Sequence, residues 1–235
     1  MNALVLGGSG GIGRAFVEQM SRKSGIERIH ATWNSHEPDS GDSKVSWYRL
    51  DATREEEIEG LCRQLGEIDI SINAIGMLHD DQYGPEKSTR QISADYFSRS
   101  IEINTLPTLL LARHLAPNLK HKRPAHFATV SARVGSIEEN YLGGWYSYRA
   151  SKAALNMILK TLSIEWKRSL PNVVVSALHP GTTDTALSKP FQKQVPPGNL
   201  FTTAQSAAYM MQVLQGLSPK DSGNFWSFDG ERLPW

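Results

Sequence analysis

The chain of 235 residues is poor in several features that mark particular classes of protein, and the first of these is cysteine. Cys62 is the only cysteine, so no disulfide can form within the chain and a reducing compartment is favoured. A charge bias is also lacking. The net charge is +1 and the charges are dispersed, which gives no support for binding to nucleic acid or to an acidic membrane.

Long apolar runs are missing as well. No run of about 20 apolar residues occurs, so no transmembrane helix is expected. The first apolar stretch, residues 3–6, has neither the basic start nor the length of a signal peptide. Together these absences predict a soluble, cytoplasmic protein.

No linker rich in Pro, Ser or Gly divides the chain, so we expect one domain over residues 1–235 with a sizeable core. Strand patterns alternate with helical patterns. This predicts an α/β fold: a Rossmann-type, doubly wound parallel sheet of about seven strands in the order 3-2-1-4-5-6-7, with helices on both faces. The expected strands are residues 2–6, 26–33, 45–50, 68–75, 125–130, 172–179 and 223–228.

A glycine-rich turn separates the first expected strand from a stretch of helical periodicity. It comprises Gly7, Gly8, Ser9, Gly10, Gly11, Ile12 and Gly13. In this context the backbone can approach a pyrophosphate, and the N-terminus of the helix supplies N–H donors and a favourable dipole. The spacing fits G-x-G-x-x-G, G-x-x-G-x-x-G and G-x-x-x-G-x-G alike. The glycines therefore predict a nucleotide-binding turn without choosing its family, and a plain flexible turn is the alternative.

The end of the second expected strand bears on which nucleotide binds. An NAD site usually has an acidic residue there, about 20 residues after the glycines. Here residues 32–36 read Thr-Trp-Asn-Ser-His, and the first acidic residue is Glu37. Without a carboxylate a 2′-phosphate is not repelled, and Asn34, Ser35 and His36 offer it donors. We expect NADP(H) to be preferred, with NAD(H) as the alternative cofactor.

Two further segments stand where expected strands end, and sheets of this kind bind ligands at their carboxyl edge. Asp51 follows the third strand and can accept from an adenine amino group, although a simple turn aspartate explains it equally well. Asn73, Ala74 and Gly76 end the fourth strand, and their small size leaves room for a cofactor. The His-Asp-Asp run at 79–81 matches no ligand spacing, so no metal site is expected.

Residues 145–160 carry the strongest chemical signal. They read as a helix without Gly or Pro, and Tyr148 and Lys152 lie four residues apart on one face. A tyrosine titrates at about 10, and a nearby cation lowers that pKa, so the pair can exchange a proton with a carbonyl or alcohol oxygen. The pair alone is a weak signal, because aromatic rings often rest on lysine stems. Asn104 and Ser131 are further polar candidates, the latter at the end of the fifth strand.

Taken in order, these residues resemble the short-chain dehydrogenase/reductase (SDR) family in its short, one-domain form. The matching positions cover nearly the whole chain: Gly7, Gly11, Gly13, Asp51, the segment 73–76, Asn104, Ser131, Tyr148, Lys152, Pro180 and Gly181. The resemblance selects the G-x-x-x-G-x-G register at the turn. More loosely, residues 143–148 resemble the C-factor-like branch of the family.

The resemblance implies a role for each matching residue. Tyr148 is expected to be the general acid/base, Lys152 to lower its pKa and to bind the nicotinamide ribose, and Ser131 to orient the substrate. Asn104 is expected to hold a water that links Lys152 to solvent. The nicotinamide is expected to lie among Pro180, Gly181, Thr183 and Thr185, and the adenosine half near Asp51 and the segment 73–76.

The segment around 182–202 is rich in proline and follows directly on the expected nicotinamide site. This position predicts a substrate lid, and an ordinary surface loop is the alternative. The expected substrate pocket is formed by the lid and by the loops 77–79 and 133–145. The family resemblance also implies a homodimer or homotetramer formed through the helix of Tyr148.

The predicted function is that of an oxidoreductase that transfers a hydride between NADP(H) and a small carbonyl or alcohol substrate. One alternative is a nucleotide-binding signalling or regulatory protein of the same fold with little turnover. Another is a sugar-nucleotide epimerase with a similar Tyr–Lys pair, for whose C-terminal substrate domain 235 residues leave little room. The sequence predicts no nucleic-acid or membrane partner and does not identify the substrate.

Overall fold

The structure, a computed structural model, describes residues 1–39 and 41–235. Its main feature is an eight-stranded sheet in the order β10-β9-β6-β5-β4-β1-β2-β3, in which only the β9–β10 pair is antiparallel. The strands are β1 (Asn2–Leu6), β2 (Arg28–Trp33), β3 (Val45–Arg49), β4 (Ile70–Asn73), β5 (Ala125–Val130), β6 (Val173–His179), β9 (Asn224–Ser227) and β10 (Arg232–Leu233).

The predicted fold class and strand order are confirmed, with β9 as the seventh strand of the predicted series. The predicted number of strands was one too few for this sheet. β10 pairs with β9 through a tight turn in which Gly230 has a φ of 86° and donates its N–H to the carbonyl of Ser227. A strand of two residues is too short to show an alternating pattern, which explains why the sequence did not reveal it.

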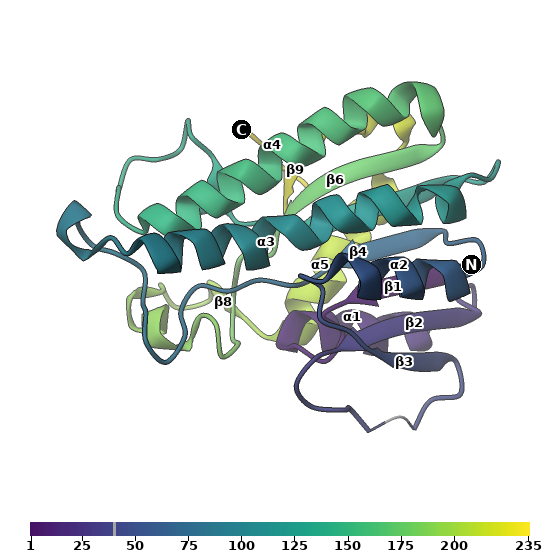
Figure 1. Ribbon diagram of the computed structural model, residues 1–235, viewed down its shortest axis with the longest axis horizontal. Coiled ribbons are helices and arrows are strands. Elements are labelled where there is room, and N and C mark those ends of the chain that lie inside the picture. Colours follow the sequence, from purple (N-terminus) through teal and green to yellow (C-terminus); the bar gives the residue numbers. More distant parts are fainter. Residues whose placement is uncertain (40) are drawn as a thin grey trace.

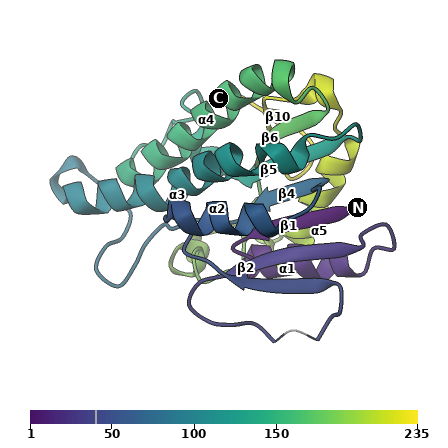
Figure 2. The ribbon, with the colours of Figure 1, turned by 45° about the vertical axis from the view of Figure 1, so that its right-hand side comes forward.

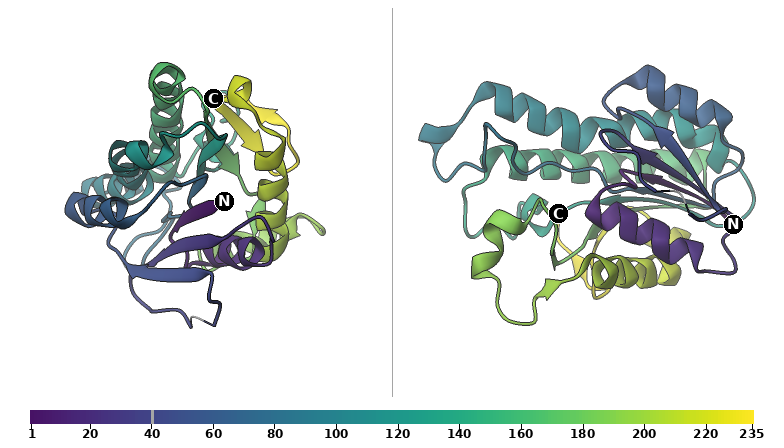
Figure 3. Two further views of the ribbon diagram at one scale, coloured as in Figure 1. Left: turned by 90° about the vertical axis from the view of Figure 1, so that its right-hand side faces the viewer. Right: turned by 90° about the horizontal axis from the view of Figure 1, so that it is seen from below.

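Five α-helices cover the two faces of the sheet. They are α1 (Gly11–Ser21), α2 (Glu55–Gln64), α3 (Ala94–Leu115), α4 (Tyr146–Ser169) and α5 (Thr203–Gly216). The end-on view shows α2, α3 and α4 on one face and α1 and α5 on the other (Figure 3). The two longest helices, α3 and α4, run side by side (Figure 1 and Figure 2). These layers complete the doubly wound arrangement expected from alternating strands and helices.

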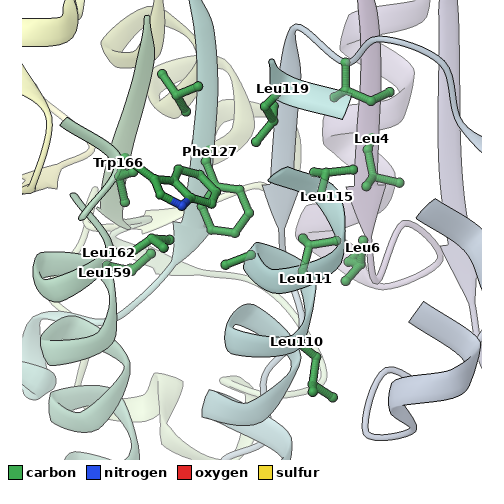
Figure 4. Packing of buried hydrophobic residues seen from close by; sticks show 14 of the residues in the cluster. Leu4, Leu6, Leu110, Leu111, Leu115, Leu119, Phe127, Leu159, Leu162 and Trp166 are labelled. Carbon is green, nitrogen blue, oxygen red and sulfur yellow. The ribbon is translucent and has the colours of Figure 1, made fainter. Parts of the chain in front are cut away.

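Each face has its own buried cluster. The cluster under α2, α3 and α4 contains Leu4, Leu6 and Phe127 from the strands, and Trp166 of α4 meets Phe127 edge-on at 5.1 Å between ring centroids (Figure 4). The cluster under α1 and α5 contains Phe16 and other apolar residues. Because both faces are covered, the residues of the central strands β1, β4, β5 and β6 are almost all buried, as expected of a parallel sheet.

The parallel strands bring their carboxyl ends to one edge of the sheet. The turns after β1, β4, β5 and β6 all lie there, so the glycine turn, the segment 73–76, Ser131 and Pro180 are gathered although they are far apart in the sequence. In the described residues no helix combines the length and apolar character needed to cross a membrane.

Candidate active site

The glycine turn is fixed by close backbone contacts. Gly7 has a φ of 69° and donates its N–H to Thr32 Oγ1 at 3.0 Å. A Cβ at Gly13 would lie 2.1 Å from the carbonyl oxygen of Gly7, which leaves no room for any side chain. The first turn of α1 therefore packs directly on the strand end, and glycine is required at both positions.

The start of α1 is suited to an anion. Its N-cap, Gly10, offers no side-chain hydrogen bond, and the first turn carries no acidic residue, so the free N–H groups and the helix dipole face outward. Ile12 lines the adjoining cavity, Ser9 is exposed on the turn, and a Cβ at Gly11 would touch Thr185 at 3.0 Å. A dinucleotide pyrophosphate fits this cradle.

A cleft of about 590 Å³ lies beside the ends of β2 and β3. Asn34 and Asp51 line it together with polar residues of α3, whereas Ser35 is exposed beside Asn34 and does not line it. Hydrogen bonds from the hydroxyl and the N–H of Thr53 hold the pKa of Asp51 below its usual range. Asp51 is thus a turn aspartate that also lines the cleft, and its contact with an adenine amino group stays a prediction.

The turn after β4 joins this cleft to a second cavity. Ala74 and Gly76 line the second cavity. Asn73 has a different position: its amide donates to Thr108 Oγ1 at 2.9 Å and accepts from the N–H of Ile75, so it points inward and shapes the turn. The described residues contain no group of three or more His, Cys, Asp or Glu side chains that could hold a metal ion.

The second cavity, of about 300 Å³, brings together Ser131, Tyr148 and Lys152. Tyr148 is 7% exposed and Lys152 is 2% exposed, and the Lys152 ammonium lies 5.9 Å from the centre of the Tyr148 ring. Lys152 Nζ donates to the carbonyl of Val130 at 3.0 Å, which ties α4 to the end of β5. The helix and the strand thus hold three predicted residues around one space.

The protonation states differ from the expectation. Burial raises the pKa of the Tyr148 phenol well above its usual range and lowers the pKa of Lys152 to about 8. We expected Lys152 to lower the pKa of Tyr148, and this is not observed in the structure. The reason is that burial of Tyr148 and Lys152 penalises the charged form of each group.

Asn104 lies behind this cavity. Its Oδ1 accepts from the N–H of Met77 at 2.6 Å, and its Nδ2 donates to Met77 O and to Ser151 Oγ, both at 2.9 Å. It therefore connects α3, the loop after β4 and α4. The space over Gly76 lies between Asn104 Oδ1 and Lys152 Nζ, at 3.6 and 3.5 Å from the position of a Cβ on that glycine.

The segment after β6 forms another wall. Pro180, Gly181, Thr183 and Thr185 all line the cavity, and Gly181 has a φ of 71° with the Phe201 ring 2.6 Å from where a Cβ would stand.

Beyond this wall the chain makes a closed loop. Two short strands, β7 (Thr182–Thr183) and β8 (Leu200–Phe201), pair in parallel and bring its ends together. A 3-10 helix between them, η4 (Lys189–Gln194), places Phe191 in the wall of the cavity. The imidazole of His79 lies 3.3 and 3.2 Å from the carbonyl oxygens of Ala186 and Leu187, so the loop after β4 holds this segment in place.

Sequence reasoning missed the residues that shape the start of α4. Trp145 has a φ of 52° and is the one residue other than glycine with a positive φ in the described ranges. Its ring lines the cavity, 6.3 Å from Tyr148 and 5.0 Å from Phe191 between centroids. Glu86, only 2% exposed, accepts from the N–H of Trp145 through its carbonyl and from the N–H and hydroxyl of Ser147 through its carboxylate.

Only the adjacent Gly143 and Gly144 signalled an unusual backbone before this helix, and nothing in the sequence linked it to Glu86. Asn156 was also missed. It accepts a hydrogen bond from Ser131 Oγ at 2.7 Å and lies one helical turn after Lys152, so the spacing 148, 152, 156 on one helix face was the available signal.

An anion cradle at a helix N-terminus, joined to a buried Tyr–Lys–Ser cavity at the same sheet edge, is typical of dinucleotide-dependent oxidoreductases. Comparison with known proteins makes this specific. The model of the short chain dehydrogenase family matches residues 1–196. The chain is 35% identical over 192 residues to 1-hydroxy-2-glutathionyl-2-methyl-3-butene dehydrogenase of Rhodococcus sp. (strain AD45), covering 79% of this chain and 78% of that protein.

Two other matches extend the comparison. C-signal of Myxococcus xanthus is 31% identical over 170 residues, with 72% of this chain and 94% of that protein covered. The crystal structure of NADPH-bound carbonyl reductase from chicken fatty liver superposes with a TM-score of 0.87 at 25% identity, covering 100% of this chain and 94% of that one. The chain belongs to the short-chain dehydrogenase/reductase family and is an NAD(P)-dependent oxidoreductase, which confirms the predicted family.

Proposed function

We propose that this protein transfers a hydride between NADP(H) and a carbonyl or alcohol group of a small molecule, with Tyr148 as the general acid/base. The observation that carries the proposal is the convergence of Ser131, Tyr148 and Lys152 on one cavity that adjoins the glycine turn. The four predicted catalytic residues, Asn104 included, are all buried. Asn104 and Ser131 each donate a hydrogen bond to a side chain of α4, and Lys152, one helical turn after Tyr148, donates to the end of β5.

The cofactor, when bound, supplies or receives the hydride at its nicotinamide. During reduction the carbonyl carbon gains the hydride and its oxygen gains the proton of Tyr148, which burial keeps on the phenol until then. Lys152, with a pKa of about 8, is mostly protonated at neutral pH and stabilises the phenolate that forms. Ser131 orients the substrate oxygen, and alcohol oxidation follows the reverse course.

The preference for NADP(H) is part of the proposal. Asn34 lines the cleft beside β2 and β3, and no acidic residue stands at the end of β2, so the carboxylate that would repel a 2′-phosphate from that position is absent. The carbonyl reductase of similar structure is described as NADPH-bound. Titration with NADPH and with NADH, followed by tryptophan quenching, tests the preference. Tighter binding of NADH would contradict it, and Asn34→Asp should weaken NADPH binding by about 10-fold through charge repulsion.

For the substrate we propose an apolar carbonyl or alcohol covered by a lid over residues 182–202. The wall facing Tyr148 is formed by apolar side chains: Leu78, Val134, Trp145, Leu187, Phe191 and Val195. Such a wall stabilises a substrate by removing apolar surface from water. The expected loops 77–79 and 133–145 each contribute lining residues.

We also propose that the protein forms a homo-oligomer through α3 and α4. Leu109 of α3 and Met157 and Ile164 of α4 are 48%, 66% and 64% exposed, an unusual exposure for large apolar residues. Sedimentation of the purified protein gives the oligomeric state, and a monomer at high concentration would contradict this part of the proposal.

The mechanism is tested with Tyr148→Phe. Removal of the phenol hydroxyl should lower turnover by at least about 100-fold, with NADPH affinity within a few-fold of the original. Tyr146→Phe is the matched control, because Tyr146 is on the same helix turn but 41% exposed. Full activity of Tyr148→Phe would refute the mechanism. Tight NADPH binding by the unmodified protein without turnover of any carbonyl would favour the regulatory alternative.

A further inference from the structure

Ser131 has an unexpected partner in the structure. Its hydroxyl lines the cavity and donates to Asn156 Oδ1 at 2.7 Å. Both residues are nearly inaccessible, at 2% and 3% exposure. Asn156 does not line the cavity, so it reaches the reacting atoms only through Ser131.

The other half of the Asn156 amide is unsatisfied. Asn156 Nδ2 is buried and has no hydrogen-bond partner among the described residues. Leaving a buried donor unpaired costs about 1–3 kcal/mol, so its presence needs an explanation. A half-turn about the Cβ–Cγ bond of Asn156 would exchange Oδ1 and Nδ2 and direct the N–H group at Ser131 Oγ.

This exchange changes what Ser131 offers to the cavity. With Oδ1 toward Ser131, the serine proton is used by Asn156 and only lone pairs face the substrate. With Nδ2 toward Ser131, the serine oxygen accepts from Asn156 and its proton is free for a substrate oxygen. A carbonyl oxygen is an acceptor and needs the second arrangement, whereas an alcohol can donate and is served by the first.

We propose that Asn156 is a positioning residue that sets the hydrogen-bond direction of Ser131 and reverses it between carbonyl and alcohol substrates. The inference rests on the proposed function, because it assigns the substrate oxygen to the cavity at Ser131. The backbone of Ser131 is held independently by its N–H bond to the carbonyl of Leu178 at 2.8 Å, so the side chain can change partner without moving the strand.

The test uses Asn156→Asp and Asn156→Ala, alone and combined with Ser131→Ala. An ionised aspartate only accepts, so it locks the serine proton away from a carbonyl; a protonated aspartate can donate again. We expect kcat/KM for carbonyl reduction to fall by about 10-fold in Asn156→Ala. In Asn156→Asp the activity relative to the unmodified protein should recover as the pH falls. Arg133, Tyr148, Lys152 and His179 also face the cavity. In the Ser131→Ala background these groups meet the same aspartate, so a recovery that acts through Ser131 should be absent there.

The combined variants separate positioning from a general packing role. If Asn156 acts through Ser131, its replacement in the Ser131→Ala background should change kcat/KM by less than about 2-fold. An equal loss in both backgrounds, or a ratio that does not vary with pH, would overturn the inference while leaving the proposed function intact. NADPH affinity and thermal unfolding confirm that each variant is folded. An unmodified protein that binds NADPH but reduces no carbonyl would overturn the proposed function and the inference with it.

Discussion

The cleft and the cavity at the carboxyl edge of the sheet share Ile75 but are lined by different kinds of groups. The side of the glycine turn and Asp51 combines backbone features with polar side chains: tight glycine contacts, a free helix terminus, the Asp51 turn and polar residues of α3. The substrate side depends on side chains from distant segments, including Trp145 and Phe191. Charge follows the same division. Hydrogen bonds favour the charged form of Asp51, whereas burial penalises the charged forms of Tyr148 and Lys152.

This comparison predicts that a backbone change harms the cofactor side most. Gly13→Ala would place a Cβ 2.1 Å from the Gly7 carbonyl oxygen, so the turn or the helix must shift. We expect NADPH affinity to fall by about 100-fold, measured by fluorescence titration. Gly60→Ala is the control: Gly60 is within α2 with no atom within 4 Å of a Cβ, and the change should add up to about 1 kcal/mol of stability. Unchanged affinity of Gly13→Ala would show that the turn is not needed for cofactor binding.

On the substrate side, the burial of the Lys152 charge should lower the free energy of unfolding. Lys152 has its pKa lowered from 10.5 to about 8, so below pH 8 the folded state contains a buried charge that the unfolded state solvates. Lys152→Met should therefore raise the free energy of unfolding at neutral pH, by about 2 kcal/mol. The advantage should shrink between pH 8 and 10.5, where the folded form of the original protein releases its proton before the unfolded form does.

Urea unfolding at a series of pH values measures this difference. A Met variant that is less stable at neutral pH would mean that the bond from Lys152 to Val130 O outweighs the cost of burial. A gap that does not change with pH would mean that the pKa of Lys152 is not lowered in the folded state.

The start of α4 should be the next most sensitive part of the substrate side. Glu86→Gln removes the charge that accepts from the Ser147 N–H and hydroxyl at the helix N-terminus. We expect kcat to fall by about 10-fold because the turn before Tyr148 loosens, with NADPH affinity nearly unchanged. Glu56→Gln, at a side chain 73% exposed in the first turn of α2, should leave kcat as it was. A change in NADPH affinity as large as that in kcat would show that Glu86 also supports cofactor binding, against the expected separation of the two sides.

The smallest effect is expected from a change at Phe191. Phe191→Ala removes the ring that packs against Trp145 at 5.0 Å, so the apolar wall loses surface but the chemistry is untouched. The expected result is a KM for carbonyl substrate raised by about 5-fold, with kcat within 2-fold by steady-state kinetics. Tyr141→Ala, which alters a side chain 87% exposed on the neighbouring loop, serves as the control. A fall in kcat alone would assign Phe191 a part in the chemical step.

The same division explains what the sequence could and could not predict. The strand at 125–130 was predicted with its observed bounds, and the strand order followed from alternation and handedness. The glycine turn and the Tyr148–Lys152 spacing are local patterns with steric or helical causes. Glu86, by contrast, meets Ser147 across 61 positions, and no local pattern encodes that contact.

Two expectations failed for reasons of packing. Asn73 points into the fold, where its side-chain amide donates to Thr108 Oγ1. A buried amide needs such a hydrogen-bond partner. The pKa of Tyr148 rises because its phenol is buried, and burial cannot be derived from a spacing of four residues. The cytoplasmic location, the oligomeric state and the assignment to a branch of the family stay predictions.

The central claim is that the Tyr148 cavity performs hydride transfer from NADPH to a carbonyl carbon. Its most direct test is a single turnover with NADPH deuterated at the transferable position and a panel of apolar aldehydes and ketones, with the alcohol product analysed by mass spectrometry. The account predicts one deuterium in the product of the unmodified protein and almost no product from Tyr148→Phe. Tight NADPH binding with no deuterium in any alcohol, or equal labelling by Tyr148→Phe, would contradict it.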